Sequence, residues 1–148
     1  MHYVYKDDTH TSLLLEGDDA LSFNASMVHF SKKIEIKKCT IVDFDVFGMY
    51  CLGGLHIHDC IIRCEVSWQS GGHNHEPIVI ENCVFEKFVD FEDCTFDSRV
   101  ILRNVHFKGG TNLFGNQSTP VVVIFAVPPL LDNVSGDINL DTFRVNMK

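Results

Sequence analysis

A short apolar motif recurs along nearly the whole chain and limits the folds that it can adopt. Each copy is a triplet with apolar residues at its first and third positions. The six copies begin at Leu13, Ile34, Leu55, Ile78, Val100 and Val121. Successive copies start 21, 21, 23, 22 and 21 residues apart. Such a narrow spread is typical of repeat architectures, so the sequence predicts structural repeats with a period of about 22 residues.

Alternation inside each repeat indicates β-strands rather than helices. Apolar residues alternate with polar ones, as in Ile34-Glu35-Ile36, and successive side chains of a strand point to opposite faces. Further strand-like triplets at Val66 and Val89 follow the first set by 11 residues. Strands this short bury an apolar face only by stacking, one coil per repeat. We therefore expect an all-β fold, a single-stranded right-handed parallel β-helix (β-solenoid) of about six coils.

The length of 148 residues predicts one domain, residues 1–148, with a single apolar core. A solenoid exposes its interior at both ends, so each end needs a cover. We expect residues 1–11 to form an N-terminal cap and residues 12–136 to form the coils. Residues 137–148 are expected to form a C-terminal cap or a tail strand.

Cysteines occupy one repeated position, five residues after the start of a triplet. Cys39, Cys60 and Cys83 share this position in consecutive repeats, so we expect them to form an inward column. In-register neighbours hold parallel Cβ atoms about 4.8 Å apart, beyond the usual disulfide Cβ spacing of about 3.8 Å. The column is therefore expected to contain free, buried thiols. Phe85 and Phe107 stand two positions further on and predict an adjacent aromatic column in the interior.

An apolar column is also expected on the outside of the solenoid. One position after the triplet start, side chains should face solvent, yet Val79, Ile101 and Val122 occupy this position in the C-terminal half. Contiguous apolar side chains on a solvent-facing strand predict an interaction face. A second copy of the chain or the chain's own C-terminal tail would cover it.

The histidines suggest a candidate metal site. His56 and His58 share one strand face, and His73, His75 and Glu76 follow in a glycine-containing loop one turn later. Imidazole and carboxylate groups from these positions could converge on a divalent ion. The alternative interpretation is that these histidines are simply solvated. Outside this possibility, we expect no cofactor.

A second candidate feature is an acidic face on the half-period strands. Its members are Asp43, Asp45, Asp90, Glu92 and Asp93. Paired carboxylates can perform acid–base chemistry on a glycosidic bond or hold Ca²⁺. The alternative is a charged sheet face that keeps the protein soluble and resists edge pairing.

Charge and hydrophobic patterning exclude several partners. The chain carries 20 acidic and 12 basic residues, a net charge of −8, which disfavours direct binding to nucleic acid. No apolar run approaches the roughly 20 residues of a membrane-spanning helix. The N-terminal residues lack the pattern of a signal peptide, and six cysteines then fit reduced thiols. We therefore expect a cytoplasmic protein that does not bind membranes.

Three segments carry a resemblance to known proteins. Ile78–Phe85 (IVIENCVF) and Val100–Phe107 (VILRNVHF) resemble coil repeats of right-handed parallel β-helices of the pectate-lyase-like group. Cys94–Ser98 (CTFDS) resembles a pentapeptide repeat. The resemblance extends over roughly residues 13–143 and implies the fold far more than a function. Members of the first group include carbohydrate-active enzymes, and some pentapeptide-repeat proteins are acidic mimics of DNA.

Three functional hypotheses follow. The first is a non-catalytic scaffold or binding module of unknown ligand, with a protein partner or a second copy on its apolar face. The alternatives are a carbohydrate-active or carbohydrate-binding β-helix and an acidic DNA mimic. The sequence contains no G-x-S-x-G, H-E-x-x-H, P-loop or dinucleotide-binding G-x-G-x-x-G motif, so no catalytic residue is assigned. The first hypothesis is favoured on this ground.

Overall fold

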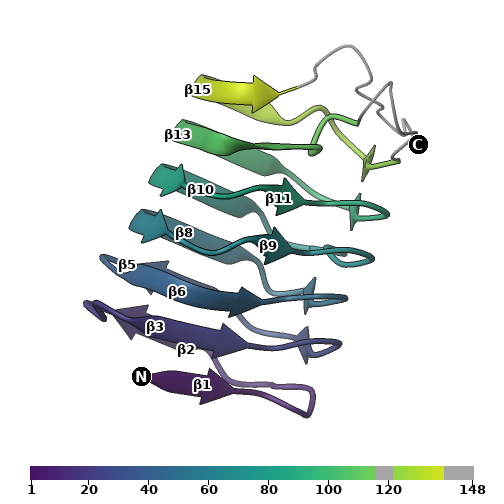
Figure 1. Cartoon of the computed structure of the whole chain (residues 1–148). Coiled ribbons are helices and arrows are strands. Elements are labelled where there is room, and N and C mark those ends of the chain that lie inside the picture. The colour runs from purple at the N-terminus through teal and green to yellow at the C-terminus, as the bar shows by residue number, and fades with distance from the viewer. Residues whose placement is uncertain (116–121, 139–148) are drawn as a thin grey trace.

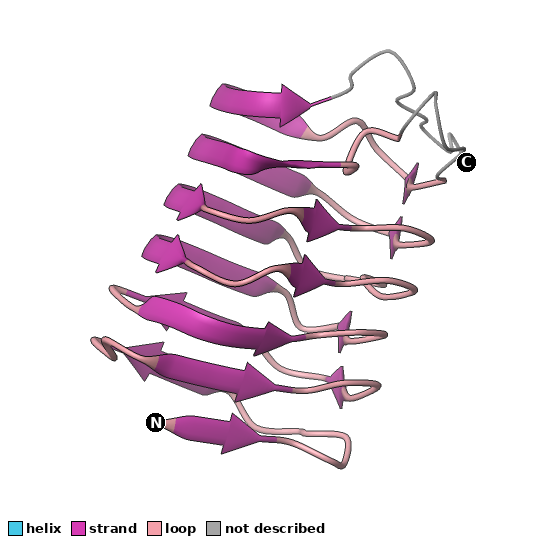
Figure 2. Ribbon diagram, in the orientation of Figure 1, coloured by secondary structure: helices cyan, strands magenta, loops and turns pink. Residues whose placement is uncertain are grey.

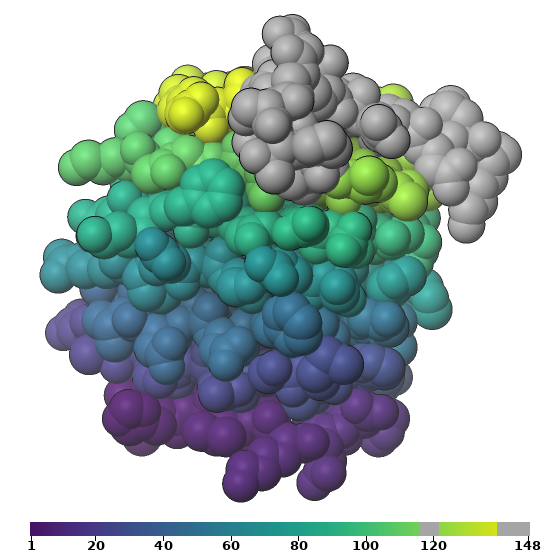
Figure 3. Space-filling model, turned by 45° about the vertical axis from the view of Figure 1, so that its right-hand side comes forward, coloured from purple at the N-terminus to yellow at the C-terminus, as the bar shows by residue number. Residues whose placement is uncertain are grey.

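Successive laps of the chain lie on top of one another as parallel strands in the computed structural model, which describes residues 1–115 and 122–138 (Figure 1). The described residues contain strands and loops without a helix (Figure 2). They form a parallel β-solenoid with a period of about 22 residues, as expected. The solenoid has about five turns rather than six. Its coils appear as coloured bands along the axis, so a single face displays residues from many repeats (Figure 3).

The strands form three stacks. The first stack contains β2 (Leu13–Glu16), β5 (Ile34–Lys37), β8 (Leu55–Ile62), β10 (Ile78–Phe85), β13 (Val100–Thr111) and β15 (Leu130–Ile138). The second contains β1 (His2–Val4), β3 (Leu21–Asn24), β6 (Thr40–Asp45), β9 (Val66–Ser67) and β11 (Val89–Asp90), and the long β13 also reaches it. On the third side, β4 (His29–Phe30) pairs with β7 (Tyr50–Cys51), and β12 (Thr95–Phe96) pairs with β14 (Ile124–Phe125).

The first five triplets stack in the predicted register. Ile34 pairs with Leu55, Leu55 with Ile78 and Ile78 with Val100. Parallel pairing of equivalent residues places like side chains above one another, and this produces continuous columns inside and outside the sheet. The spacing of these five triplets therefore determines the positions of the side chains at the start of β2, β5, β8, β10 and β13.

The sixth triplet was assigned wrongly. Residue 121 lies outside the described residues, and Val122 does not continue the outward column, because Ile101 pairs with Leu130. Ile124 pairs with Thr95 on the third side, so this segment still belongs to the coil that contains β13. Two prolines without N–H donors then precede β15. The last lap is consequently longer, and the outward apolar column consists of Val79, Ile101 and Leu130.

The predicted inward columns are confirmed. Cys60 and Cys83 pair directly, Cys39 precedes them in the adjoining coil, and all three thiols are free and buried. Their side chains donate to backbone carbonyl groups inside the core, and each behaves as a small apolar residue. The rings of Phe85 and Phe107 stack with centroids 5.2 Å apart. The core is therefore a set of ladders that runs along the solenoid axis.

A ladder of one carboxylate and three amide side chains lies at the corner where β8, β10, β13 and β15 bend. Asp59, Asn82, Asn104 and Asn133 have φ angles of 57°, 53°, 52° and 53°, in the left-handed region. Each asparagine donates a hydrogen bond to the preceding member, over 3.2, 3.0 and 2.9 Å. Asparagine tolerates this backbone conformation better than most residues, which explains its recurrence here.

Candidate functional site

A histidine–carboxylate cluster lies on the outer face of the first stack. Glu35 comes from β5, His56 and His58 from β8, and Glu81 from β10. Glu35 pairs with His56 across the strands, and His58 pairs with Glu81. Side chains two residues apart on a strand share a face, so β8 presents both imidazoles between the two carboxylates.

The short contacts in this cluster run diagonally between strands. Nε2 of His58 lies 2.8 Å from Oε2 of Glu35, and Nε2 of His56 lies 2.7 Å from Oε1 of Glu81. Nδ1 of His56 is 3.6 Å from the same Oε2 of Glu35. Nδ1 of His58 is 3.3 Å from Oδ2 of Asp59. Each imidazole therefore has a carboxylate near both of its nitrogens, and the two rings stack with centroids 4.1 Å apart.

Partial burial strengthens these interactions. The four side chains are between 18% and 27% exposed, so solvent reaches the cluster without surrounding it. The hydrogen bond from His58 lowers the pKa of the Glu35 carboxyl, burial opposes this shift, and the charge of Lys33 adds to the lowering. Glu35 is consequently ionised at neutral pH and accepts hydrogen bonds or binds cations.

The cluster has the donor set of a metal site. One ligand atom each from Glu35, His56 and His58 can be chosen so that all lie within 4.8 Å of one another. In the part of the chain that the structure describes, no other group of at least three such residues meets this criterion. Two imidazoles and one carboxylate are also a common ligand set for transition metals.

The structure separates the other predicted metal ligands from this cluster. Nδ1 of His73 lies 3.1 Å from Oδ2 of Asp97, and its ring packs against Tyr50 on the third side of the solenoid. His75 is exposed in the same loop. The loop passes a different corner, so the one-turn offset in sequence does not bring these imidazoles together with His56 and His58.

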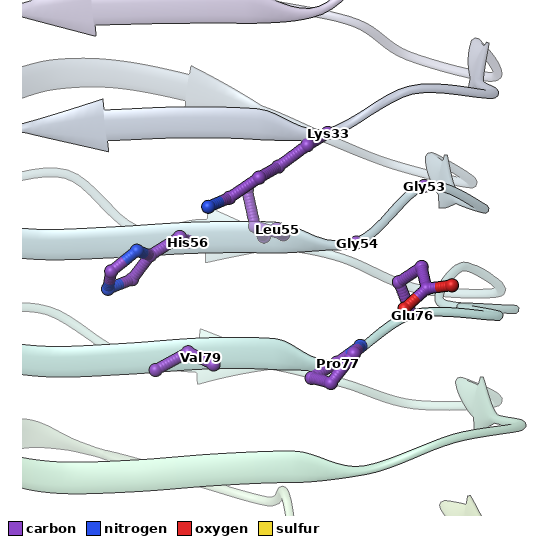
Figure 4. Close-up of a pocket in the computed structure, with 8 residues that line it drawn as sticks. All are labelled: Lys33, Gly53, Gly54, Leu55, His56, Glu76, Pro77 and Val79. Carbon is purple, nitrogen blue, oxygen red and sulfur yellow. The ribbon is translucent and has the colours of Figure 1, made fainter.

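Glu76 borders a groove next to the cluster instead of joining it. The residues that line this groove with Glu76 are Lys33, Gly53, Gly54, Leu55, His56, Pro77 and Val79 (Figure 4). Glu76 lies at the Gly54 and Pro77 end of the groove, whereas His56 lies at the other end. Sequence reasoning missed Glu35 as a partner of the histidines. The sequence feature that could have identified Glu35 is its position one repeat, 21 residues, before His56.

The predicted acidic face divides into two parts. Asp43, Asp45 and Asp90 line a groove on the second stack, together with Glu65 and the exposed ring of Phe88. The remaining members, Glu92 and Asp93, belong to the turn that follows β11.

Amide groups donate hydrogen bonds to one carboxylate of this groove. The Asp90 carboxylate accepts hydrogen bonds from Gln69 over 2.6 Å and from Asn112 over 2.8 Å. It also accepts the backbone N–H of Glu92 over 2.9 Å. Asp90 therefore organises the turn of its own coil and ties three neighbouring coils together.

Three buried thiols and the tryptophan provide no accessible chemistry. Burial raises the pKa of the Cys94 thiol to about 12, and burial also raises the pKa values of Cys39 and Cys51. Trp68 is buried, and its ring N–H donates to the Met49 carbonyl over 2.8 Å. Its indole ring faces the core and offers no stacking surface to a ligand.

Comparison with known proteins agrees with this architecture. Residues 75–115 match the family of pentapeptide repeats (9 copies). Searches of curated proteins and of solved structures gave no match. No described helix is long and apolar enough to cross a membrane. The matched segment contains β10, β11, β12 and β13, so the chain is a parallel β-helix with pentapeptide-like repeats.

Proposed function

We propose that this β-solenoid with pentapeptide-like repeats is a non-catalytic binding module that pairs with a second copy of itself. The observation that carries the proposal is the outward column of Val79, Ile101 and Leu130. Val79 pairs with Ile101 and Ile101 with Leu130, so three apolar side chains follow one another on one face of the sheet. Leu130 is 49% exposed. Covering such a column removes apolar surface from water.

The surroundings of the column suit a symmetric pair. Nη1 of Arg103 lies 3.9 Å from Oε2 of Glu81, so both charge signs border the column. In a two-fold pair the same patch faces itself, and the arginine of one copy can approach the glutamate of the other. A rigid sheet face also loses little conformational freedom on association.

Light scattering after size-exclusion chromatography tests this proposal. The parent chain should have the mass of a dimer, and Ile101→Glu should have the mass of a monomer because it places a charge in the interface. Val84→Glu is the matched control: it adds the same charge to β10 beyond the bend at Asn82. It should remain dimeric. A parent that stays monomeric at its highest soluble concentration would overturn the proposal.

Carbohydrate binding is a second candidate, supported by the groove of the second stack. There the ring of Phe88, 41% exposed, lies in one groove with Asp43, Glu65, Gln69 and Asp90. An exposed aromatic face beside fixed acceptors can hold a sugar ring by stacking and hydrogen bonding. A glycan array tests this candidate. Binding that Phe88→Ala abolishes would support it, and an array without signal would refute it.

A further inference from the structure

We propose that Glu35, His56 and His58 together bind one divalent transition-metal ion of the zinc class. This site lies on the outer face of the first stack, and none of its three ligands belongs to the apolar column of Val79, Ile101 and Leu130. It also differs from the set expected from sequence, because a glutamate of the preceding coil replaces the loop residues His73 and His75.

The ligand atoms already face one another. Oε2 of Glu35 lies 2.8 Å from Nε2 of His58 and 3.6 Å from Nδ1 of His56. Tetrahedral ligands about 2.0–2.1 Å from a zinc ion are about 3.3 Å from each other. The two separations from Glu35 lie on either side of this value. Side-chain rotations that also unstack the two imidazole rings, now 4.1 Å apart, would bring the three atoms around one ion.

Two further carboxylates support the required tautomers. A histidine that binds a metal through one nitrogen usually donates its other N–H to a carboxylate or carbonyl, which fixes the ring. Glu81 is 2.7 Å from Nε2 of His56, and Asp59 is 3.3 Å from Nδ1 of His58. When the ion replaces the proton between His58 and Glu35, these outward N–H groups leave the lone pairs of Nδ1 of His56 and Nε2 of His58 free to bind it.

The sheet holds the ligands in place before the ion binds. Both histidines are on β8, which lies between β5 and β10 in the sheet. Glu35 is on β5, and Glu81 is on β10. Hydrogen-bonded strands fix the backbone of all four residues, which reduces the cost of ordering the site.

The donor set determines the class of ion. Imidazole nitrogen suits Zn²⁺, Ni²⁺, Cu²⁺ and Fe²⁺, whereas Ca²⁺ and Mg²⁺ prefer sites built from oxygen. Three protein ligands leave a fourth position of a tetrahedral ion for water or another ligand. The side chains of Glu35, His56 and His58 are partly exposed, so an ion can reach them from solvent.

Isothermal titration of the full chain with Zn²⁺ tests the proposal. The parent should bind one ion per chain, and Glu35→Gln and His56→Asn should each lose this binding. Glu81→Gln removes only an outer carboxylate and should weaken binding by about 10–100-fold. The double variant His73→Asn/His75→Asn is the matched control, since it removes the other His-x-His pair, and its zinc affinity should equal that of the parent.

Two further measurements keep the result interpretable. Far-ultraviolet circular dichroism must show the parent's β-spectrum for each variant, and Glu35→Gln preserves the size of the side chain. Bound Co²⁺ should show ligand-field bands without thiolate charge transfer, because the ligands are nitrogen and oxygen. Absence of zinc binding by the parent, unchanged binding by Glu35→Gln, loss of binding in the double variant, or a thiolate band would each overturn the proposal.

Discussion

Asn104 donates a hydrogen bond from its amide nitrogen to the amide oxygen of Asn82, 3.0 Å away in the adjoining coil. Both residues have left-handed backbones, and Asn133 repeats the contact from the next coil over 2.9 Å. The corner thus combines a special backbone conformation with a continuous chain of amides. Either feature alone would favour asparagine there.

Asn104→Ala should destabilise the protein for both reasons. It removes two side-chain hydrogen bonds. It also removes the polar group that helps an asparagine to adopt the left-handed backbone, so we expect a loss of about 2–4 kcal/mol. Asn104→Gly removes the same hydrogen bonds but tolerates the backbone, and it should retain more stability than the alanine variant. Urea unfolding measures both. An alanine variant as stable as the glycine variant would contradict the strain argument.

Phe85→Ala should be among the most damaging single substitutions. Phe85 is buried and stacks on Phe107 with an interplanar angle of 12°. Truncation leaves a cavity in the centre of the solenoid, and we expect a loss of about 3–5 kcal/mol in the free energy of unfolding. Phe85→Leu fills most of the space and should cost less. Equal effects of the two substitutions in urea unfolding would argue against close packing at this position.

Thiol reactivity should distinguish one cysteine from the other five. Five cysteines are buried, whereas Cys64 is half-buried. Burial raises the pKa of the Cys94 thiol to about 12 and also raises the pKa of Cys64, so it is the exposure of the Cys64 thiol that distinguishes it. A thiol-specific chromogenic reagent should label Cys64 first in the native protein and all six after unfolding. Cys64→Ser should remove the early phase. Fast labelling of several thiols in that variant would contradict the buried column.

Asp18 should make stability depend on pH in the acid range. The backbone N–H of Ala20 donates to its carboxylate over 2.9 Å, and the Met1 ammonium lies 3.1 Å away; these contacts lower the pKa of Asp18. A carboxyl group with a lowered pKa stabilises the folded state above its unfolded pKa, and this contribution disappears as the pH falls through the folded value. Asp18→Asn should therefore unfold more easily near neutral pH.

The expected pH window for Asp18 lies below the ordinary pKa of an aspartate, 3.8. As the pH falls below that value, the stabilities of the parent and Asp18→Asn should converge. Denaturant unfolding of both proteins from neutral pH into this range measures the difference. Asp19→Asn is the control, because this neighbouring carboxyl is exposed. A difference that persists to the lowest pH would mean that charge is not its cause.

Much of the fold was predictable because in-register stacking imposes the same spacing on every lap. Equivalent positions such as Cys60 and Cys83 must pair once the lap length is known, and they do. The same reasoning failed at Val122, where a longer lap happens to contain an apolar triplet at the expected distance. The spacing of the apolar triplets cannot distinguish a strand of the next coil from a strand that completes the current coil.

The candidate site was half predictable for a related reason. His56 and His58 share a face through the alternation of a single strand, so their proximity follows from local geometry. Glu35 joins them from the neighbouring coil. Its sequence position is one repeat, 21 residues, before His56. The loop that carries His73 has no regular spacing. The sequence therefore could not show which corner of the solenoid this loop occupies.

The direct superposition of Leu55 and Ile78 has a consequence for how such a chain changes in length. Everything between these two residues is one complete lap, and its first and last surfaces have the same outline. Excision of that segment, or its duplication, would join surfaces that already match. The solenoid can therefore be shortened or extended by whole coils while its cross-section stays the same.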